Sequence, residues 1–153
     1  MVQSTNFHSS NPSVSPQELV GEPVNFPEDV KDYFVEKNGQ RFAGIHLLLD
    51  FWGANNLTDK TTIEATLVEA ATAAEATVLA TNFRQFTESE GVSGVLVLAE
   101  SHISIHTWPE CSFAAIDIFM CGKCDPYRCV DVLKSAFEPA KVLVKEQRRG
   151  LEK

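Results

Sequence analysis

The sequence lacks the features that would assign it to the membrane or secreted classes. No apolar run reaches the roughly 20 residues that a membrane-spanning helix needs, since the apolar segment 45–49 ends at Asp50. Residues 1–19 have neither a basic start nor an apolar stretch, so we expect no secretory signal. These absences predict a cytoplasmic protein that has no membrane partner.

Positive charge is also scarce, and the formal net charge is −8. This argues against a nucleic acid as partner, because phosphate backbones bind basic surfaces. Six acidic residues and two lysines give residues 1–40 a net charge of −4. The same residues are rich in Ser, Asn, Pro and Glu and show no sustained periodicity. We interpret 1–40 as a flexible N-terminal extension, with 30–35 as a candidate helical or docking segment, and 41–153 as one domain.

Cysteine is limited to four residues within a stretch of 19, namely Cys111, Cys121, Cys124 and Cys129. A disulfide framework is not expected, because cytosolic thiols are kept reduced. A zinc site on Cys121-x-x-Cys124 with the other two cysteines is an alternative, but a second C-x-x-C is missing. We therefore expect no metal. Cys124 and Cys129 are interpreted as packing or surface thiols, and Cys111 as an incidental strand residue.

From Arg41 onward the sequence has clear strand and helix periodicity. Apolar and alternating segments predict strands over 42–52, 77–86, 92–99, 101–108, 113–120 and 142–144. Helical spacing predicts a helix over 61–76 after the N-cap candidates of 55–59, and Pro126 lies in the first turn of a second helix over 125–137. The pattern predicts an α+β fold, a mainly antiparallel sheet with two helices on one face. The other face would need cover, which predicts self-association.

Residues 91–122 concentrate reactive side chains among Val, Leu and Ile. They are Ser93, Ser101, His102, His106, Glu110, Cys111 and Cys121. Buried polar groups must be hydrogen-bonded or each costs a few kcal/mol, so this convergence favours a chemical site. By contrast, His46 is interpreted as an ordinary strand histidine, and His102 fits a positioning role and a simple hydrogen-bond network equally well.

Two chemistries compete for a serine in this segment. A Ser-His-acid hydrolase would need a nucleophile on a strained turn, and no G-x-S-x-G is present. In self-processing, a serine hydroxyl attacks the preceding carbonyl and the resulting ester is eliminated. Hydrolysis of the dehydroalanine then leaves a pyruvoyl group and ammonia. Such a ketone is an electron sink for amine substrates.

The sequence A-E-S-H-I-S-I-H-T-W-P-E over 99–110, followed by A-A-I-D-I-F-M-C-G over 114–122, resembles the signature of the short prokaryotic pyruvoyl-dependent S-adenosylmethionine decarboxylase proenzymes. The resemblance covers roughly residues 42–148 and leaves the first 40 outside. It implies self-cleavage between Glu100 and Ser101, which makes the covalent pyruvoyl cofactor from Ser101. It also implies decarboxylation of S-adenosylmethionine for spermidine biosynthesis.

The resemblance also implies roles in catalysis and assembly. Ser93 resembles the serine that polarises the attacked carbonyl, and His106 the base that removes the serine α-proton. Cys121 resembles the general acid that protonates the substrate carbon after CO2 leaves. Two processed chains are expected to form a homodimer, a two-sheet αββα sandwich. Each site would take Ser101 and Cys121 from one subunit and Ser93 and His106 from the other.

Three residues are expected to bind the substrate. Glu110 resembles the carboxylate that holds the ribose hydroxyls, and Phe86 resembles an aromatic ring stacked on adenine. Aligning Phe86 requires one extra residue before Ser93. Phe51 or Trp52 would supply the opposing ring. Two alternatives stay open: a pyruvoyl-dependent arginine or ornithine decarboxylase, and a non-catalytic zinc- or partner-binding module.

Overall fold

The computed structural model describes residues 34–151, so residues 1–33 of the predicted 1–40 extension, with most of its 30–35 segment, lie outside the described residues. The described part begins with a short antiparallel hairpin of β1 (Val35–Lys37) and β2 (Gln40–Phe42). The sequence analysis did not predict this hairpin, because strands of three residues are too short to show a period.

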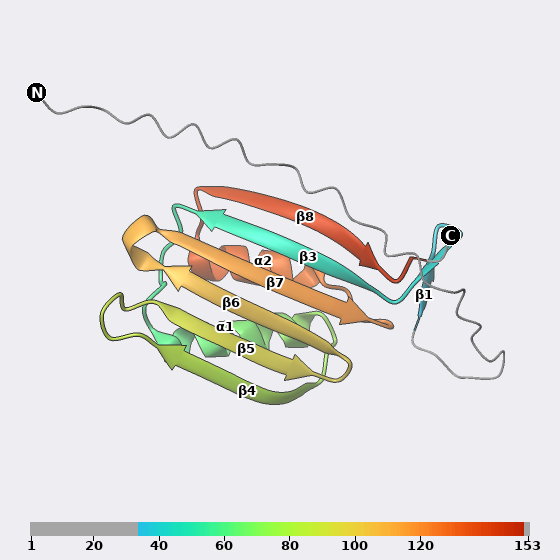
Figure 1. Ribbon diagram of the computed structural model, residues 1–153, viewed down its shortest axis with the longest axis horizontal. Coiled ribbons are helices and arrows are strands. Elements are labelled where there is room, and N and C mark those ends of the chain that lie inside the picture. The colour runs from blue at the N-terminus through green and yellow to red at the C-terminus, as the bar shows by residue number, and fades with distance from the viewer. Residues whose placement is uncertain (1–33, 152–153) are drawn as a thin grey trace, which may run out of the picture. The chain divides into compact units, whose positions relative to one another are not determined.

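Six strands form one antiparallel sheet in the order β4-β5-β6-β7-β3-β8 (Figure 1). They are β3 (Gly44–Trp52), β4 (Val78–Gln85), β5 (Val92–Leu98), β6 (Ser101–Trp108), β7 (Phe113–Cys121) and β8 (Lys141–Arg149). The strand predicted over 142–144 is much longer, since β8 pairs with β3 along its whole length. Its charged second half suits an edge strand, where charges oppose further pairing.

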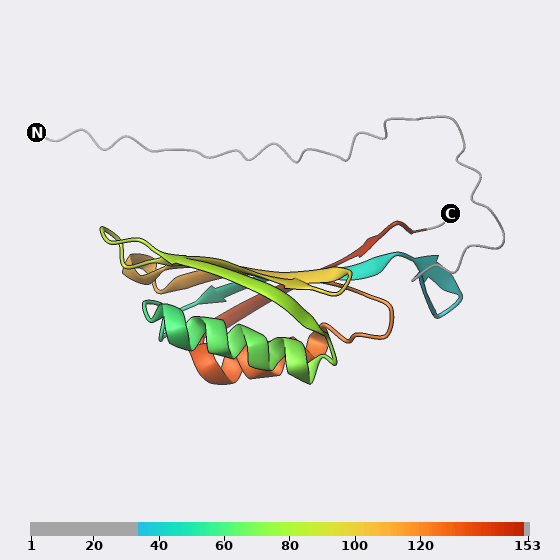
Figure 2. The same ribbon diagram turned by 90° about the horizontal axis from the view of Figure 1, so that it is seen from below.

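Two helices, α1 (Lys60–Ala73) and α2 (Tyr127–Phe137), lie on one face of the sheet (Figure 2). This confirms the predicted α+β arrangement. Asp59 caps α1, and its carboxylate accepts a hydrogen bond from the Thr61 backbone N–H at 3.0 Å. The Thr62 hydroxyl also donates to this carboxylate at 2.6 Å, and this bond first, then those from the backbone N–H groups, lowers the pKa of Asp59. No helix among residues 34–151 is long and apolar enough to cross a membrane.

Strand alternation gives the sheet two different faces. Along β3, the side chains of Leu47, Leu49 and Phe51 are buried in the core beneath the helices. The next residues along the same strand point the other way, and Leu48 and Trp52 are among the exposed large hydrophobic residues. We call this second side the open face. Because cross-strand partners point to the same side, the open face carries one set of residues from every strand.

The open face carries His46 on β3, Asp117 on β7, and Ser104 and His106 on β6. Ser104 and Asp117 are direct cross-strand partners, and His46 and His106 lie in the rows on either side of them. At one end of the face, the rings of Trp52, Phe113 and Trp108 follow one another at centroid distances of 4.3 and 5.3 Å. A sheet face with this many polar and aromatic side chains, uncovered by the helices, is a place for a partner or a site.

Candidate active site

The predicted cleavage point lies in a tight turn between β5 and β6. Leu98 pairs with Ser101, so Ala99 and Glu100 form the turn between them. Glu100 has a φ of 60°, the left-handed conformation that side chains other than glycine avoid. That conformation costs an L-residue about 1–2 kcal/mol. The residue that donates the scissile carbonyl is therefore strained before any chemistry begins.

Cys121, at the end of β7, contacts both residues of the predicted scissile pair. Its thiol donates a hydrogen bond to the Glu100 carbonyl oxygen at 3.0 Å, and its backbone N–H donates to Ser101 Oγ at 3.3 Å. The Ser101 hydroxyl lies 3.6 Å from Cys121 Sγ and is largely buried, with 9% of the residue exposed. A donor on a carbonyl oxygen makes the carbonyl carbon more electrophilic. Sequence reasoning missed this contact, because β-strand pairing alone does not reveal which side chain meets a turn.

Ser93 and His106 form a second cluster at the other end of the same strands. They are a cross-strand pair of β5 and β6, and Ser93 Oγ lies 2.8 Å from His106 Nδ1. His106 lies five positions after Ser101 along β6, a distance of about 17 Å at about 3.4 Å per residue. Within one chain, the structure therefore brings the predicted site residues together as two separate halves.

The residues predicted to bind substrate lie beside the His106 half. Glu110 is exposed in the short 3-10 helix Pro109–Cys111, which follows β6 directly. Phe86 is 46% exposed just after β4, and it lines a hollow of about 370 Å³ with residues 87–89. An exposed ring and an exposed carboxylate at one end of the sheet are available to a ligand.

The expectation for Phe51 is corrected by its burial. The Phe51 side chain is 0% exposed and packs against Phe137 in the core, at a centroid distance of 6.5 Å. A ring between sheet and helices cannot stack on a ligand. Trp52, the other residue of the predicted pair, is 43% exposed on the open face. Alternation along β3 explains why only one of two consecutive aromatic residues is available.

The two strand histidines share the open face with Asp117. His46 Nε2 lies 3.2 Å from Asp117 Oδ1, which agrees with its interpretation as a strand histidine held by a partner. His102 lies in the row formed by Phe119 and His46, with its ring 5.7 Å from that of Phe119. Burial, and secondarily the nearby His46, lowers the pKa of His102, against an opposing effect of Asp117. The neutral imidazole is therefore the favoured form.

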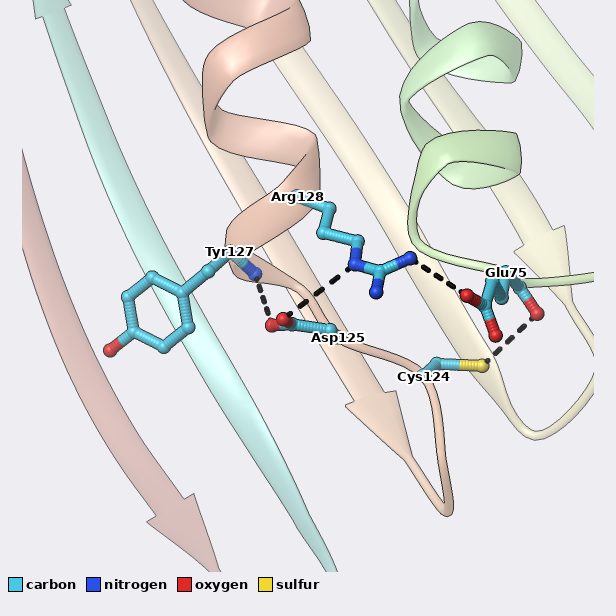
Figure 3. A network of polar contacts seen from close by, with 5 residues as sticks. All are labelled: Glu75, Cys124, Asp125, Tyr127 and Arg128. Atoms are coloured by element: carbon cyan, nitrogen blue, oxygen red, sulfur yellow. Dashed lines mark hydrogen bonds and ion pairs between the residues drawn. The ribbon is translucent and has the colours of Figure 1, made fainter.

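The loop after Cys121 is fixed to the end of α1 (Figure 3). The Cys124 thiol donates to the Glu75 carbonyl oxygen at 3.5 Å, and the Arg128 guanidinium pairs with the Glu75 carboxylate at 2.7 Å. Asp125 accepts a hydrogen bond from the Tyr127 backbone N–H at 3.0 Å. These contacts hold the segment that leads away from the thiol of Cys121.

The other cysteines lie in different surroundings. Cys129 is buried in α2, where its thiol donates to the Ala70 carbonyl oxygen at 3.3 Å, and burial raises its pKa to about 12. This confirms its interpretation as a packing thiol. Cys111 is exposed in the 3-10 helix rather than in a strand. Within the described residues, no group of three or more His, Cys, Asp or Glu side chains is arranged to hold a metal ion.

Comparison with known proteins finds relatives that share one name. The S-adenosylmethionine decarboxylase proenzyme of Methanococcus maripaludis strain C5 is 41% identical to this chain over 111 residues, which are 71% of this chain and 90% of that protein. A proenzyme of the same name from Thermomicrobium roseum is 36% identical over 109 residues, 71% of this chain and 94% of that protein.

A solved structure agrees with these sequences. The crystal structure of the adenosylmethionine decarboxylase from Aquifex aeolicus superposes on this chain with a TM-score of 0.66 at 32% sequence identity. The superposed part is 73% of this chain and 94% of the Aquifex chain. Residues 45–150 match the family described as S-adenosylmethionine decarboxylase. Together with the strained Glu100–Ser101 turn, these matches show that the chain belongs to the S-adenosylmethionine decarboxylase family.

Proposed function

We propose that this chain is a self-processing proenzyme that cleaves itself between Glu100 and Ser101 and then decarboxylates S-adenosylmethionine. One observation carries the proposal: the Cys121 thiol donates to the carbonyl oxygen of Glu100, next to a buried serine hydroxyl in a strained turn. A polarised carbonyl beside a serine hydroxyl favours attack of Ser101 Oγ on the preceding carbonyl carbon. The family membership supports the same chemistry.

The processing step exchanges an amide for an ester. Ser101 Oγ bonds to the Glu100 carbonyl carbon, the peptide C–N bond breaks, and the serine nitrogen takes up a proton. A base then removes the α-proton of residue 101, the Cβ–O bond breaks, and residues 1–100 leave with a new carboxylate. Water then hydrolyses the dehydroalanine that remains at residue 101. Its nitrogen leaves as ammonia, and the C-terminal fragment begins with a ketone. Cys121 serves the first step as the donor that polarises the carbonyl.

The base for the second step comes, in our proposal, from a second chain. His106 lies about 17 Å along its own strand from Ser101, too far for proton transfer within one chain. Packing of two open faces about a two-fold axis would bring each His106–Ser93 pair to the Ser101 of the other chain. The exposed tryptophans and leucine of the open face supply an apolar surface for that contact. Ser93 would then join Cys121 as a second donor to the carbonyl.

The pyruvoyl group, once formed, supplies a carbonyl that withdraws electrons from the α-carbon of an amine substrate. Cys121 is then suited to deliver a proton to that carbon after CO2 leaves, because its thiol already points at position 100–101. Phe86 and Trp52 offer exposed rings to adenine and to the sulfonium cation, for which a ring face contributes about 0.5–2 kcal/mol. Glu110 offers a carboxylate to the ribose hydroxyls.

Glu110 and Phe86 favour an adenosyl substrate over arginine or ornithine. The names of the relatives, S-adenosylmethionine decarboxylase proenzymes, support the same substrate. Neither the other substrate class nor a non-catalytic module is favoured by the comparisons. The product would donate aminopropyl groups for spermidine synthesis. The expected compartment remains the cytoplasm, and the expected absence of a nucleic-acid partner remains a prediction.

Intact-mass measurement of the purified full-length protein tests the proposal. We expect two fragments, 1–100 and 101–153, and the second should start with a pyruvoyl group. The processed protein should release CO2 from carboxyl-labelled S-adenosylmethionine.

Variants of the two reactive residues test their roles. Ser101→Ala should give one uncut, inactive chain, and Cys121→Ala should process slowly and show no productive turnover. Ser135→Ala, an exposed serine of α2, is the matched control and should process normally. A wild-type protein that stays a single uncut chain would overturn the proposal, and release of CO2 from arginine or ornithine instead would change the substrate.

A further inference from the structure

Cys121 and Cys124 are the two ends of a turn that a disulfide could span. The residues between them, Gly122 and Lys123, form the turn, and Gly122 has a φ of 62°. The first and fourth Cα atoms of such a turn lie within about 7 Å of each other. Disulfides join Cα atoms about 4.4–6.8 Å apart, a range that the two ends of such a turn can reach. A Cβ placed on Gly122 would meet no atom within 4 Å, so the turn is also open to its surroundings.

Neither thiol is locked in its present place. Cys121 Sγ has a hydrogen bond to the Glu100 carbonyl and a contact with Ser101 Oγ, while Cys124 Sγ has one weak bond to the Glu75 carbonyl (Figure 3). Both side chains are partly exposed and both thiols are free. The buried thiol of Cys129 and the distant Cys111, before the start of β7, do not share this turn.

The surroundings assign different tasks to the two thiols. Burial, and then the charges of Cys121 and Glu75, raises the pKa of Cys124. A thiol with a raised pKa is a poor first nucleophile, so Cys124 suits the second, resolving attack. A cavity of about 220 Å³ lies beside this turn and is lined by Gly122, Lys123 and Cys124 together with Asp125, so a small molecule can reach the Cys124 side of the turn.

We propose that Cys121 and Cys124 form an oxidative modification site for hydrogen peroxide, which converts the pair into a disulfide and switches the enzyme off. The Cys121 thiolate attacks one peroxide oxygen, the O–O bond breaks, and a sulfenic acid forms while hydroxide leaves and is protonated to water. The Cys124 thiolate then attacks the sulfenic sulfur, the S–S bond forms, and the S–O bond breaks to give a second water. Two thiols lose two electrons, and the peroxide gains them.

The loss of activity rests on the proposed function of Cys121, whereas the disulfide itself does not. In the disulfide, Cys121 has no thiol hydrogen, so it can neither polarise the Glu100 carbonyl nor protonate substrate carbon. Reduction restores the thiol. The processed enzyme should therefore be inactivated reversibly, and the unprocessed chain should be slowed in cleavage.

Peroxide treatment of the processed enzyme, followed by mass spectrometry, tests the proposal. The oxidised C-terminal fragment should be lighter by two hydrogen atoms. Trypsin cuts after Lys123, between the two cysteines, so without reductant the peptide ending at Lys123 should remain linked to the peptide 124–128. Decarboxylase activity should fall at least tenfold and return fully with dithiothreitol.

Two variants separate the possible outcomes. Cys124→Ser should keep basal activity but lose recovery, because the sulfenic acid of Cys121 has no resolving thiol and oxidises further. Cys111→Ser, on the same fragment, should behave as wild type in both assays. Equal recovery of wild type and Cys124→Ser, or the absence of the linked peptides, would overturn the proposal. A linked pair of peptides without loss of activity would uphold the modification site and instead refute the role proposed for Cys121.

Discussion

At the scale of residues, the conformation of Glu100 makes cleavage sensitive to strain. Glycine adopts a φ of 60° at no steric cost, asparagine adopts it with a small cost, and glutamine is as strained as glutamate. If attack on the carbonyl releases this strain, Glu100→Gln should cleave fastest, Glu100→Asn more slowly and Glu100→Gly slowest. A loss of about 1 kcal/mol of strain corresponds to a decrease of roughly three- to tenfold in the cleavage rate. Gel densitometry of the two fragments over time measures it.

The Gln and Asn variants control for charge, because both replace the carboxylate that lies 4.0 Å from Cys121 Sγ with a neutral amide. Equal cleavage rates in all three variants would show that strain does not contribute.

Glu100 also illustrates the limits of sequence reasoning. The motif identified Glu100 and Ser101 as the scissile pair, but a left-handed φ at a glutamate is set by the hairpin register, which no local propensity predicts.

At the scale of elements, one hydrogen bond joins α2 to the edge strand β8. The Tyr127 hydroxyl donates to the Glu146 carboxylate, which raises the pKa of Tyr127 to about 12 and lowers that of Glu146. Tyr127→Phe should lower the free energy of unfolding by less than about 1 kcal/mol near pH 7, since the pair is partly exposed. Urea unfolding followed by circular dichroism measures the difference.

The effect of Tyr127→Phe should depend on pH with a definite sign. A carboxyl whose folded pKa is lowered adds stability above its unfolded pKa, and that stability is lost as the pH falls through the folded value. The difference between wild type and Tyr127→Phe should therefore shrink as the pH falls below the ordinary pKa of a glutamate carboxyl. Glu146→Gln, which keeps an acceptor but cannot titrate, should remove this pH dependence, and a pH dependence that persists in Glu146→Gln would assign it to another group.

Elements with a strong period were predictable and those without one were not. The helices and the strands β3 to β7 were predicted within a few residues, because all of them except β4 bury an alternating or helical set of apolar side chains. The second half of β8 was missed because its charged residues carry no apolar pattern, and only pairing with β3 makes it a strand. Phe51 and Trp52 were left as alternatives because the phase of β3, which decides between core and open face, depends on the position of the helices.

At the scale of the whole molecule, the two half-sites make one chain incomplete. A two-fold axis that exchanges the Ser101 and His106 ends of β6 would pass near Ser104, midway between them. Ser104 and its partner Asp117 lie in the middle of the open face, between the two clusters. The same axis would cover Leu48 and Trp108, which are large hydrophobic side chains exposed on this face. We therefore propose that two chains pair symmetrically with their open faces together.

Co-expression of two inactive chains decides whether the site is shared. A Ser101→Ala chain and a His106→Ala chain should each be uncut alone, because each lacks one half of every site. In a mixed dimer, the intact Ser101 of the second chain meets the intact His106 of the first. With random assortment, half of the dimers are mixed and each has one complete site, so activity should reach roughly a quarter of the wild-type level. Only the chain carrying His106→Ala should be cut, which distinct affinity tags reveal. If His106 acted within its own chain, neither tag would appear on a fragment, and the mixture would be as inactive as its parents.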